Sequence, residues 1–371
     1  MDEWGRGARV ALGMSGGVDS AVAAIVLMRA GYRVVGVTCL FCEGDASDGA
    51  ARAREVCDAL GIAHEVRDCR AAFERRIVGP FVEAYGRCLT PSPCVECNAR
   101  VKIPELVVAA DDLGCDLVAT GHYARIAQLL SDEASREATS DGRYVVKRAL
   151  DARKDQSYML ALLDQQLLSR LLLPMGGLTK TEARIIAAEA GLPVADEPDS
   201  QDICFAPQGY RGLLAQRGVP SAPGPIVDIS GAVVGRHDGL ENYTIGQRKG
   251  IGVAADRPYY VIGKRIEDHA LIVGFEEQSL ISGVTVADPV WQAYRQPPDR
   301  LEAMVKLRYR SEPVACIITV GLDGCANVEL RSPQPTTAPG QYAVFTMGDT
   351  VLGCGMIEEV ERVCPTSRNC S

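Results

Sequence analysis

One short segment near the start of the chain limits the possible folds of this 371-residue sequence more than any other feature. Gly13-Met-Ser-Gly-Gly-Val-Asp-Ser20 follows a β-rich run, Arg9 to Met14, and opens a helical pattern, Ser20 to Ala30, that ends at Gly31. A glycine-rich turn between a strand and a helix directs backbone N–H groups and the positive end of the helix toward one point. The segment therefore predicts an anion site, for which phosphate is the expected ligand.

The same alternation of strand and helix continues to about Thr120. Helical patterns at Asp48 to Leu60 and Lys102 to Leu113 are each followed by glycine, which suits a helix C-terminus. Further strand candidates are Arg33 to Cys39, Ala63 to Arg67 and Asp116 to Thr120. Strands that alternate with helices are typical of an α/β fold with a parallel sheet, and we expect one here.

The composition changes in the second half of the chain. Thr179-Lys-Thr-Glu182 is a capping box that predicts a helix to Ala190, and the α/β region extends to about Phe205. A turn-rich connection at Pro220 to Pro225 is followed by short strands separated by Gly, Pro and Asp, which predicts a small β-barrel or sandwich. These later strand candidates include Ala303 to Tyr309, Val314 to Val320, Asn327 to Arg331 and Gln341 to Thr346. The segment from Leu130 to Gly142 has no periodicity and is expected to be an exposed loop.

Length and charge limit the class of protein. A chain of this length exceeds the usual size of one hydrophobic core, so two or three domains are expected. No apolar run approaches the roughly 20 residues that span a bilayer, and the acidic start does not suit a secretory signal. We therefore expect a cytoplasmic protein without membrane contact, whose fourteen cysteines are reduced thiols. The net charge of −9 disfavours binding of nucleic acid by the whole surface, although a local basic patch can coexist with it.

The loop from Gly13 to Ser20 also excludes two common nucleotide motifs. It lacks the Gly-Lys-Ser/Thr ending of a Walker loop and the Gly-x-Gly-x-x-Gly of a dinucleotide fold. It resembles the pyrophosphate loop of the ATP pyrophosphatases, which cleave ATP between the α and β phosphates. By this resemblance Asp19 would act through Mg²⁺ bound to the phosphates. A glycine-rich turn with a serine N-cap is the simpler alternative.

Three cysteines outside the apolar patterns are candidates for chemistry. Thr90-Pro-Ser-Pro-Cys-Val-Glu-Cys-Asn98 places Cys94 and Cys97 one helical turn apart in a segment that its prolines predict to be a loop. Such a pair suits metal, redox or sulfur chemistry, but a four-thiolate zinc site would need a second pair at similar spacing. Cys204 lies within Asp199-Ser-Gln-Asp-Ile-Cys-Phe205, flanked by acids, and taken alone it is more typical of a core cysteine.

Together, several motifs resemble one family nearly end to end: the tRNA-specific 2-thiouridylases of the ATP pyrophosphatase superfamily. In that family ATP adenylates the C2 oxygen of the wobble uridine, pyrophosphate leaves, and persulfide sulfur displaces AMP. The matching segments are the phosphate loop, Thr90 to Asn98, Ala119-Thr-Gly-His-Tyr-Ala-Arg125, Lys154-Asp-Gln-Ser-Tyr158, Asp199 to Phe205 and Tyr243-Thr-Ile-Gly-Gln-Arg-Lys-Gly250. The resemblance implies a catalytic domain at 1–207, a central linker domain at 208–278 and a C-terminal β-barrel at 279–371.

The resemblance also implies roles for individual residues. Cys204 would carry the persulfide, and Cys97 would be the partner thiol that liberates its sulfur. The residues expected against the target base are Ser92, Pro93 and Cys94. Those expected to hold ATP with Mg²⁺ are Gly13, Met14, Ser15, Gly16, Gly17, Val18, Asp19, Ser20, Gly121 and the backbone at Cys39.

Two positions depart from the usual family pattern. Many members have Asp where this chain has Cys94, and many have Met where it has Cys39. The first departure leaves a rival mechanism open, since Cys94, Cys97 and Cys204 could ligate a [4Fe-4S] cluster whose free iron binds the sulfur. The persulfide route is preferred because it needs only the two cysteines that match the family most directly.

The expected macromolecular partner is tRNA, by family resemblance the Glu, Gln and Lys tRNAs, with sulfur supplied by a cysteine desulfurase or a sulfur-relay protein. Basic residues gather in three regions: Arg143 to Lys154, Arg248-Lys249, and a predicted strand from Ala303 to Arg310 that would place Lys306, Arg308 and Arg310 on one face. By resemblance the tRNA contacts are His122, Lys154, Asp155, Gln156, Arg308, Tyr309 and Gln341. Two other functions share parts of the pattern: an amide-forming ATP pyrophosphatase acting on a small molecule, and a non-catalytic RNA-binding module.

Overall fold

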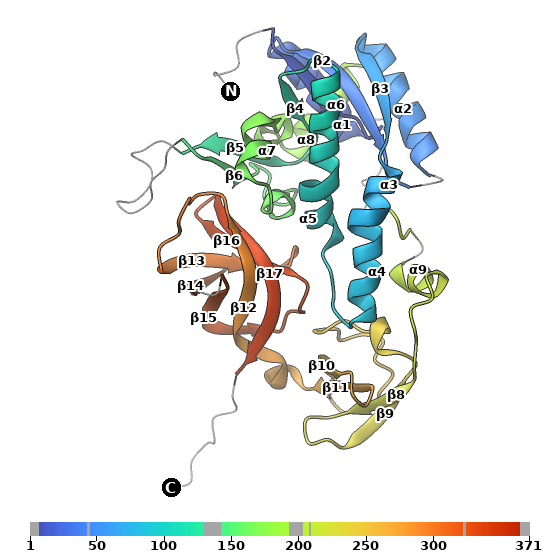
Figure 1. The fold of residues 1–371 in the computed structure, drawn as a ribbon, viewed down its shortest axis with the longest axis vertical. Coiled ribbons are helices and arrows are strands. Elements are labelled where there is room, and N and C mark those ends of the chain that lie inside the picture. The colour runs from blue at the N-terminus through green and yellow to red at the C-terminus, as the bar shows by residue number, and fades with distance from the viewer. Residues whose placement is uncertain are drawn as a thin grey trace.

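The computed structural model describes residues 7–42, 45–129, 142–192, 203–207, 209–321 and 324–363 (Figure 1). Within these residues the chain forms a parallel sheet, a small mixed sheet and a barrel. In Figure 1 the parallel sheet lies at the top, the barrel below it on the left, and the small sheet at the bottom. No helix in the described part of the chain is long and apolar enough to cross a membrane. The predicted loop at Leu130 to Gly142 lies, except for Gly142, outside the described residues.

The parallel sheet confirms the expected α/β fold. Its order is β3-β2-β1-β4-β7, and every neighbouring pair is parallel. Since β2 and β4 flank β1 on opposite sides, the loop that follows β1 opens at the point where the strand order reverses, which is where α/β sheets bind ligands. The strands are β1 (Arg9–Gly13), β2 (Arg33–Leu40), β3 (Ala63–Asp68), β4 (Leu117–Ala119) and β7 (Leu171–Leu172).

Helices cover both faces of this sheet. In β1, Val10 and Leu12 pack into the cluster under α1 and α8, whereas Ala11 packs into the cluster under α6. This is the period-two alternation of a strand with two covered faces. The helices are α1 (Val18–Arg29), α2 (Asp45–Leu60), α6 (Ile103–Asp112), α7 (Gln165–Arg170) and α8 (Lys180–Glu189). The predicted capping box of α8 is formed by Thr179 and Glu182.

Two longer helical segments each contain a π-helical turn. The first joins α3 (Arg70–Phe73), the π-turn Glu74–Val78 and α4 (Gly79–Gly86). The second joins α5 (Pro93–Cys97), the π-turn Asn98–Lys102 and α6. The helix expected from Lys102 therefore begins at Pro93, and the expected loop around Cys94 and Cys97 is wrong. Pro93 stands in the first turn of this segment, where a missing N–H costs nothing, and Pro104 lies inside it, directly after the π-turn. π-turns are rare and often mark functional sites.

The small sheet has the order β10-β11-β8-β9 and its own apolar cluster around Ile226, Val261 and Leu271. Its strands are β8 (Gly224–Val227), β9 (Val233–His237), β10 (Tyr260–Arg265) and β11 (Ala270–Gly274). The helix α9 (Tyr210–Gln216) precedes it. Short 3₁₀ helices elsewhere span Ser157–Leu160, Pro174–Gly177, Leu240–Asn242 and Glu276–Ser279.

The C-terminal strands form a closed six-stranded barrel, since β12 pairs with both β15 and β17. The strands are β12 (Leu280–Trp291), β13 (Arg300–Lys306), β14 (Val314–Val320), β15 (Ala326–Pro335), β16 (Tyr342–Met347) and β17 (Thr350–Arg362). The predicted strand to Arg310 is wrong: β13 ends at Lys306, and Arg308 begins a turn in which its backbone exchanges hydrogen bonds with Ser311. The predicted basic strand face therefore does not form.

A hairpin that sequence reasoning missed joins the barrel to the catalytic region. Its strands, β5 (Ala124–Gln128) and β6 (Tyr144–Arg148), flank the predicted loop and extend the barrel sheet through a pairing of Lys147 with Thr350. Beside it lies Gln292, which is fully buried. Its amide donates to the carbonyls of Leu160, Ala161 and Leu163 at 3.0–3.3 Å and accepts from the N–H of Val146 at 3.0 Å. One side chain from the barrel thus satisfies backbone groups of the neighbouring domain.

We expect Gln292→Leu to destabilise the contact between the barrel and the catalytic region. Leucine fills a similar volume but leaves buried carbonyl and N–H groups without partners, at about 1–3 kcal/mol for each group. A thermal melt should show an earlier transition. Gln334→Leu, at a half-buried position near the end of a strand where the amide bonds Ser332, is the matched control and should leave the transition within about 0.5 kcal/mol. Equal melts for the two variants would contradict the assignment of Gln292 as an interdomain contact.

Candidate active site

The phosphate loop has a preformed shape between β1 and α1. Gly16 has a φ of +80°, and a Cβ there would lie 2.7 Å from the carbonyl oxygen of Gly49, so no other residue fits without displacement. Ser20 closes the loop, because its hydroxyl donates to the carbonyl of Gly17 at 2.9 Å and accepts from the N–H of Ser15 at 3.3 Å. Gly17 is the N-cap of α1, so the loop lies at the positive end of that helix.

Gly121 approaches the same helix end from β4. A Cβ on Gly121 would lie 3.0 Å from the backbone nitrogen of Ser20, so glycine allows the two backbones to meet there. Cys39 lies near the carboxyl end of β2, two residues beyond the last pair that β2 makes with β1. The predicted ATP residues therefore come from one edge of the sheet. They were separated in sequence, and the topology brings them together.

Two residues in this region were missed by sequence reasoning, namely Lys180 and Tyr123. The Lys180 ammonium pairs with Asp19 Oδ1 at 2.7 Å, and the Tyr123 hydroxyl donates to the same oxygen at 2.9 Å. The Lys180 side chain is only 11% exposed although it carries charge. A lysine in the first turn of a helix opposes the helix dipole, and this signal in the capping-box sequence could have identified it.

The three candidate thiols lie around Lys102. Cys97 ends α5 and is 8% exposed, whereas Cys94 and Cys204 are exposed. In the π-turn the backbone N–H of Lys102 donates to the Cys97 thiol, and the Lys102 charge acts on all three sulfurs. Phe205, next to Cys204, packs edge-on against Phe73 at 5.6 Å and so fixes the end of the second cysteine segment.

The surroundings of the three thiols give them different pKa values. Burial raises the pKa of Cys97 to about 11 and also raises the pKa of Cys94, with Lys102 opposing both shifts. A hydrogen bond from the Cys42 thiol is the largest cause that lowers the pKa of Cys204 to about 7, and Lys102 adds to it. Cys204 is therefore the thiol that is substantially ionised at neutral pH, which suits a nucleophile.

His122 connects this cluster to the phosphate loop. It follows Gly121, bonds the Thr120 hydroxyl through Nδ1 at 2.8 Å, and has its pKa lowered to about 3 by burial and by Lys102. The imidazole is thus neutral at physiological pH. Because Lys102 acts on both Cys204 and His122, while Gly121 touches the start of α1, the thiols and the phosphate loop belong to one site.

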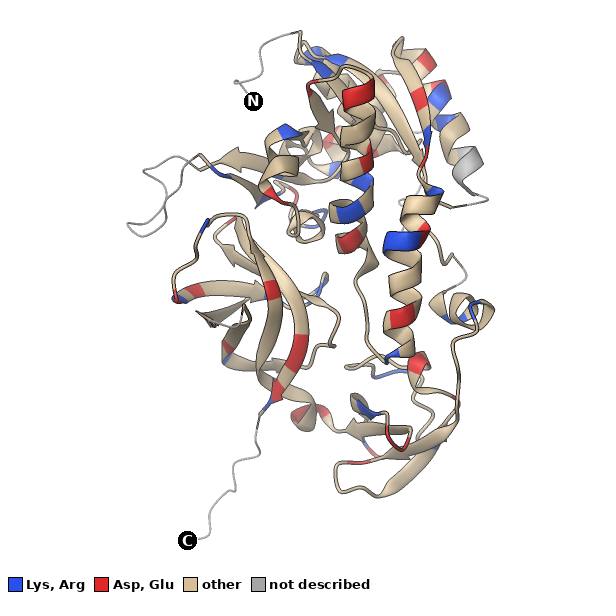
Figure 2. Cartoon of the chain, in the orientation of Figure 1, with Lys and Arg blue, Asp and Glu red and all other residues tan. Residues whose placement is uncertain are grey.

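Two of the three residues predicted to contact the target base line a groove beside α5, and Cys94 is not among its lining residues. The groove has a volume of about 620 Å³ and runs between α4, α5 and the barrel, with Ser92 and Pro93 in its wall. Arg76 and Arg100 line it as well, and the Arg76 guanidinium donates to the Arg100 carbonyl at 2.9 Å. Arg76 and Arg100 lie in the two π-turns, and Figure 2 shows Lys and Arg positions in blue on both helical segments.

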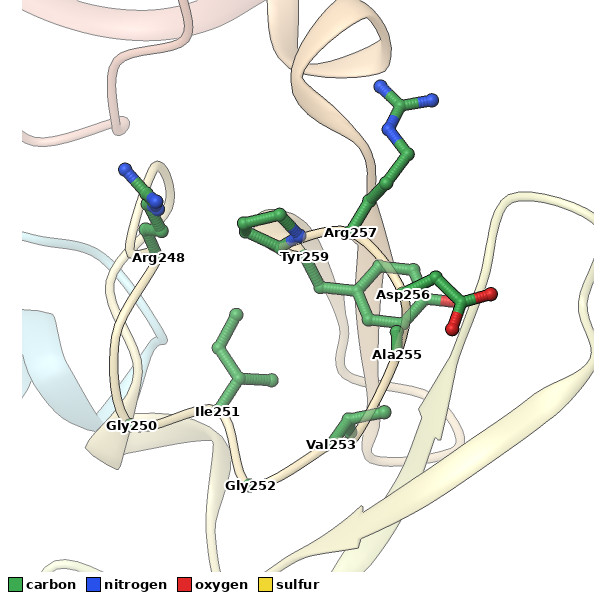
Figure 3. Close-up of a pocket in the computed structure, with 10 residues that line it drawn as sticks. Arg248, Gly250, Ile251, Gly252, Val253, Ala255, Asp256, Arg257 and Tyr259 are labelled. Atoms are coloured by element: carbon green, nitrogen blue, oxygen red, sulfur yellow. The ribbon is translucent and has the colours of Figure 1, made fainter.

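The barrel forms the other wall of this groove. The Gln341 amide donates to the carbonyl of Thr90 at 2.8 Å, and the Tyr342 hydroxyl bonds Glu96, which also pairs with Arg100. A second cavity of about 340 Å³ lies in the central domain between Arg248 and Tyr259 (Figure 3). Its lining includes none of the residues predicted to hold ATP or the target base, so we do not assign the reaction to it.

The remaining predicted tRNA residues are held mainly by protein contacts. Asp155 is 9% exposed and accepts hydrogen bonds from Ala149, Ser157 and Arg148, while Gln156 accepts from the N–H of Tyr123. Arg308 has one buried nitrogen without a hydrogen bond and lies against Gly246. The Tyr309 ring lies 6.0 Å from that of Tyr158, and Lys306 lies over both rings. In the basic stretch, Arg143 and Arg148 also bond protein groups.

Three family models cover most of the chain. They are described as a tRNA methyl transferase HUP domain, a tRNA methyl transferase PRC-barrel domain and an aminomethyltransferase beta-barrel domain, and they match residues 8–208, 213–275 and 281–357. The sequence is 44% identical to the tRNA-specific 2-thiouridylase MnmA of Chloroflexus aurantiacus, over 95% of this chain and 99% of that protein. It is 41% identical to that of Trichormus variabilis, over the same shares of the two chains.

A third relative, the tRNA-specific 2-thiouridylase MnmA of Geobacter metallireducens, is 40% identical over 94% of this chain and 96% of that protein. Among solved structures, a 4-thiouridine synthetase–RNA complex with bound ATP matches 57% of this chain and 50% of that chain, at 16% identity and a TM-score of 0.34. A likeness of that size carries no argument about this site.

We expect Lys180→Met to weaken binding of Mg-ATP at least tenfold, or about 1.4 kcal/mol. Methionine keeps the length of the buried stem but removes the charge that lies beside Asp19 and the phosphate loop. Isothermal titration with Mg-ATP measures the change. Arg184→Met, on an exposed position of the same helix, is the matched control. Unchanged affinity in folded Lys180→Met would mean that Lys180 serves only as a partner of Asp19.

We also expect iodoacetamide to alkylate Cys204 at a lower pH than Cys97. Because its pKa is lowered to about 7, Cys204 gains its thiolate as pH rises through 7, and its rate should level off above about 8. Cys97, with a pKa raised to about 11, should remain slow over this range. Lys102→Met should move the Cys204 midpoint upward, whereas Arg75→Met, at an exposed position, should not. Peptide mapping against pH measures each site, and a shared midpoint for both cysteines would refute the separation.

Proposed function

The chain belongs to the family of tRNA-specific 2-thiouridylases, and from this premise we propose that it is an ATP-dependent tRNA-uridine 2-sulfurtransferase. The observation that carries the proposal is the position of Lys102, which acts on the ionised Cys204 and on His122 beside the phosphate loop. A sulfur nucleophile and a phosphate site thus adjoin each other. Adenylation followed by sulfur transfer needs this combination, whereas an amide-forming enzyme or an RNA-binding module does not need it.

The family models carry methyl transferase in their names, whereas the relatives are named for thiolation. The chemistry of the site favours the second name. Methyl transfer has no use for a loop that holds pyrophosphate or for an ionised thiol next to it. Thiolation uses both, because an oxygen must first become a leaving group and sulfur must then replace it.

In the proposed first step, ATP is bound by the loop from Gly13 to Ser20, with Gly121 and the backbone at Cys39 completing the site. The O2 atom of the wobble uridine attacks the α phosphorus, and pyrophosphate leaves. Asp19 offers a carboxylate oxygen of the kind that Mg²⁺ prefers, and a bound Mg²⁺ would neutralise phosphate charge. Lys180, now paired with Asp19, is placed to share that task.

In the second step, sulfur carried by Cys204 as a persulfide reaches C2 of the adenylated uridine. Cys97 attacks the Cys204 sulfur, so that the S–S bond to the terminal sulfur breaks and hydrosulfide is released as a disulfide forms. Hydrosulfide adds to C2, and AMP leaves with the former uridine oxygen. The proximity of Cys97 to Cys204 around Lys102 supports these roles. A reductant must restore the thiols after each turnover.

The target uridine would enter beside Ser92, Pro93 and Cys94, where the groove meets the start of α5. A base inside an anticodon loop reaches such a site by leaving its stack. Arg76 and Arg100 in the groove suit the adjoining phosphates. The proposed tRNA contacts remain His122, Lys154, Asp155, Gln156, Arg308, Tyr309 and Gln341, of which Asp155 and Gln156 would act by shaping the backbone near Tyr123.

We keep the Glu, Gln and Lys tRNAs as the proposed substrates and a cysteine desulfurase or a sulfur-relay protein as the proposed donor. The tRNA substrate would place the reaction in the cytoplasm. The proposed domain boundaries are 1–207, 208–278 and 279–371. Each of these assignments follows from the family pattern.

The [4Fe-4S] alternative requires Cys94, Cys97 and Cys204 to converge on one cluster. In the part of the chain that the structure describes, no three Cys, His, Asp or Glu side chains are grouped closely enough to hold a metal ion. Moreover, the Cys204 thiol accepts a hydrogen bond from Cys42, which is not one of the three cluster ligands that the alternative requires. The thiols as arranged do not fit the cluster, so we derive no step through it.

We expect Cys204→Ala to abolish formation of 2-thiouridine while leaving binding of Mg-ATP unchanged. The variant lacks the atom that carries sulfur but keeps the phosphate loop. Thiolation in vitro with ATP, tRNA and a sulfur donor, read by nucleoside mass spectrometry, measures the first effect. Cys97→Ala should also abolish turnover, whereas Cys316→Ala, a buried barrel cysteine, should not.

Full thiolation by Cys204→Ala would overturn the proposed function. An anaerobic preparation separates the two sulfur routes. The persulfide route predicts full activity with iron and acid-labile sulfide near zero. Activity that rises and falls with iron content would instead favour the cluster.

A further inference from the structure

The Cys204 thiol accepts a hydrogen bond from Cys42, a cysteine that has no role in the proposed reaction. The thiol of Cys42 bonds the thiol of Cys204, although the two residues come from distant parts of the sequence. Cys42 follows the end of β2 at Leu40, while Cys204 lies beyond the last helix of the catalytic region. The family pattern assigns no role to Cys42.

Apolar packing fixes this contact from both sides. Phe41, directly before Cys42, packs against Phe73 with ring centroids 5.1 Å apart. Phe205, directly after Cys204, packs against the same ring at 5.6 Å and against Phe81 at 5.0 Å. Phe73 itself is 1% exposed. Two aromatic neighbours that share one buried ring therefore hold the two thiols together, independently of any bond between them.

The two thiols also differ from Cys97 in access to solvent. Cys204 is exposed and Cys42 is half-buried, whereas Cys97 is 8% exposed and accepts the N–H of Lys102. An oxidant from solvent therefore reaches Cys204 first. An exposed, ionised cysteine next to a second thiol is the usual arrangement of a redox-sensitive site.

We propose that Cys42 and Cys204 form a reversible redox pair, in which a peroxide oxidises Cys204 and Cys42 then closes a disulfide with it. The effect of this disulfide rests on the proposed function, because the bond would prevent Cys204 from receiving sulfur. The formation of the bond itself depends on the two thiols and on the peroxide.

The chemistry balances in two steps. The Cys204 thiolate attacks one oxygen of hydrogen peroxide, the O–O bond breaks, and the released hydroxide takes a proton to become water. This leaves a sulfenic acid on Cys204. The Cys42 sulfur then attacks the Cys204 sulfur, the S–O bond breaks, and the leaving hydroxide takes the thiol proton as a second water. A dithiol returns both electrons and restores the two thiols.

The disulfide would also protect Cys204. Without a neighbouring thiol, a sulfenic acid in excess peroxide proceeds to the sulfinic acid, which dithiols do not reduce. With Cys42 in contact, oxidation stops at a reducible stage. The pair would thus switch off sulfur loading under peroxide and allow recovery afterwards.

The test is treatment of the full-length protein with hydrogen peroxide, in the absence of tRNA, followed by blocking of free thiols and peptide mapping. The wild type should show a Cys42–Cys204 disulfide, lose thiolation activity, and regain most of it in dithiothreitol. In excess peroxide, Cys42→Ser, which keeps a hydroxyl donor, and Cys42→Ala, which loses the hydrogen bond to Cys204 and should react more slowly, should both lose activity but recover several-fold less, with sulfinic acid at Cys204. Cys88→Ser, a half-buried cysteine outside the site, is the matched control and should behave as the wild type.

A disulfide from Cys204 to Cys97 or Cys94, or sulfinic acid at Cys204 in the wild type, would overturn the proposal. So would recovery of both Cys42 variants to the wild-type level. Two variants guard against a folding defect in one, and a thermal melt before treatment detects it. If the untreated wild type made no 2-thiouridine, the proposed function would fail, but the peptide map would still decide whether the redox pair forms.

Discussion

The positive charge of Lys102, held in place by a π-turn, is the interaction on which the site depends. Three thiols and an imidazole lie within its field, which favours the thiolate form of each cysteine and disfavours the imidazolium form of His122. Burial raises the pKa of Cys97 and of Cys94 by more than the Lys102 charge lowers it, so these two thiols stay protonated. The hydrogen bond from the Cys42 thiol instead lowers the pKa of Cys204. Burial, together with the same charge, keeps His122 neutral. Lys102 therefore favours all three thiolates, and the hydrogen bond from Cys42 determines that Cys204 is the one with a lowered pKa.

The π-turn also explains how a helix can serve this purpose. In a regular α-helix the side chain of Lys102 would have a different angular position relative to Cys97, because the inserted residue rotates all that follows. The backbone N–H of Lys102 then also opposes the rise in the pKa of the Cys97 thiol, which burial causes. A second π-turn, at Glu74–Val78, lies in the neighbouring helical segment, and Arg76 from it bonds the carbonyl of Arg100. The two irregular turns thus support each other where the groove begins.

Much of this arrangement could be predicted from the sequence, for reasons that differ between its parts. The phosphate loop was predictable because Gly16 must adopt positive φ and because strand and helix patterns flank it. The helical state of Cys94 and Cys97 was not, since Pro93, one of the two prolines that suggested a loop, stands in the first turn of α5, where a proline is tolerated. The contacts of Lys180 with Asp19 and of Cys42 with Cys204 could not be predicted, because the partners are distant in sequence and only the folded sheet edge and the shared Phe73 bring them together.

The barrel is part of the same site, although its distance along the sequence suggests a separate module. Gln341 bonds the segment before α5, Tyr342 bonds Glu96 within α5, and Gln292 satisfies backbone groups near the 3₁₀ helix that follows Gln156. A shift of the barrel would therefore pull on the helix that carries Cys94 and Cys97. Since tRNA is larger than the groove, it must contact both walls to place one base inside it. The position of Cys94 and Cys97 thus depends on the surface that would recognise the RNA, so the proposed binding and the proposed chemistry share one set of contacts.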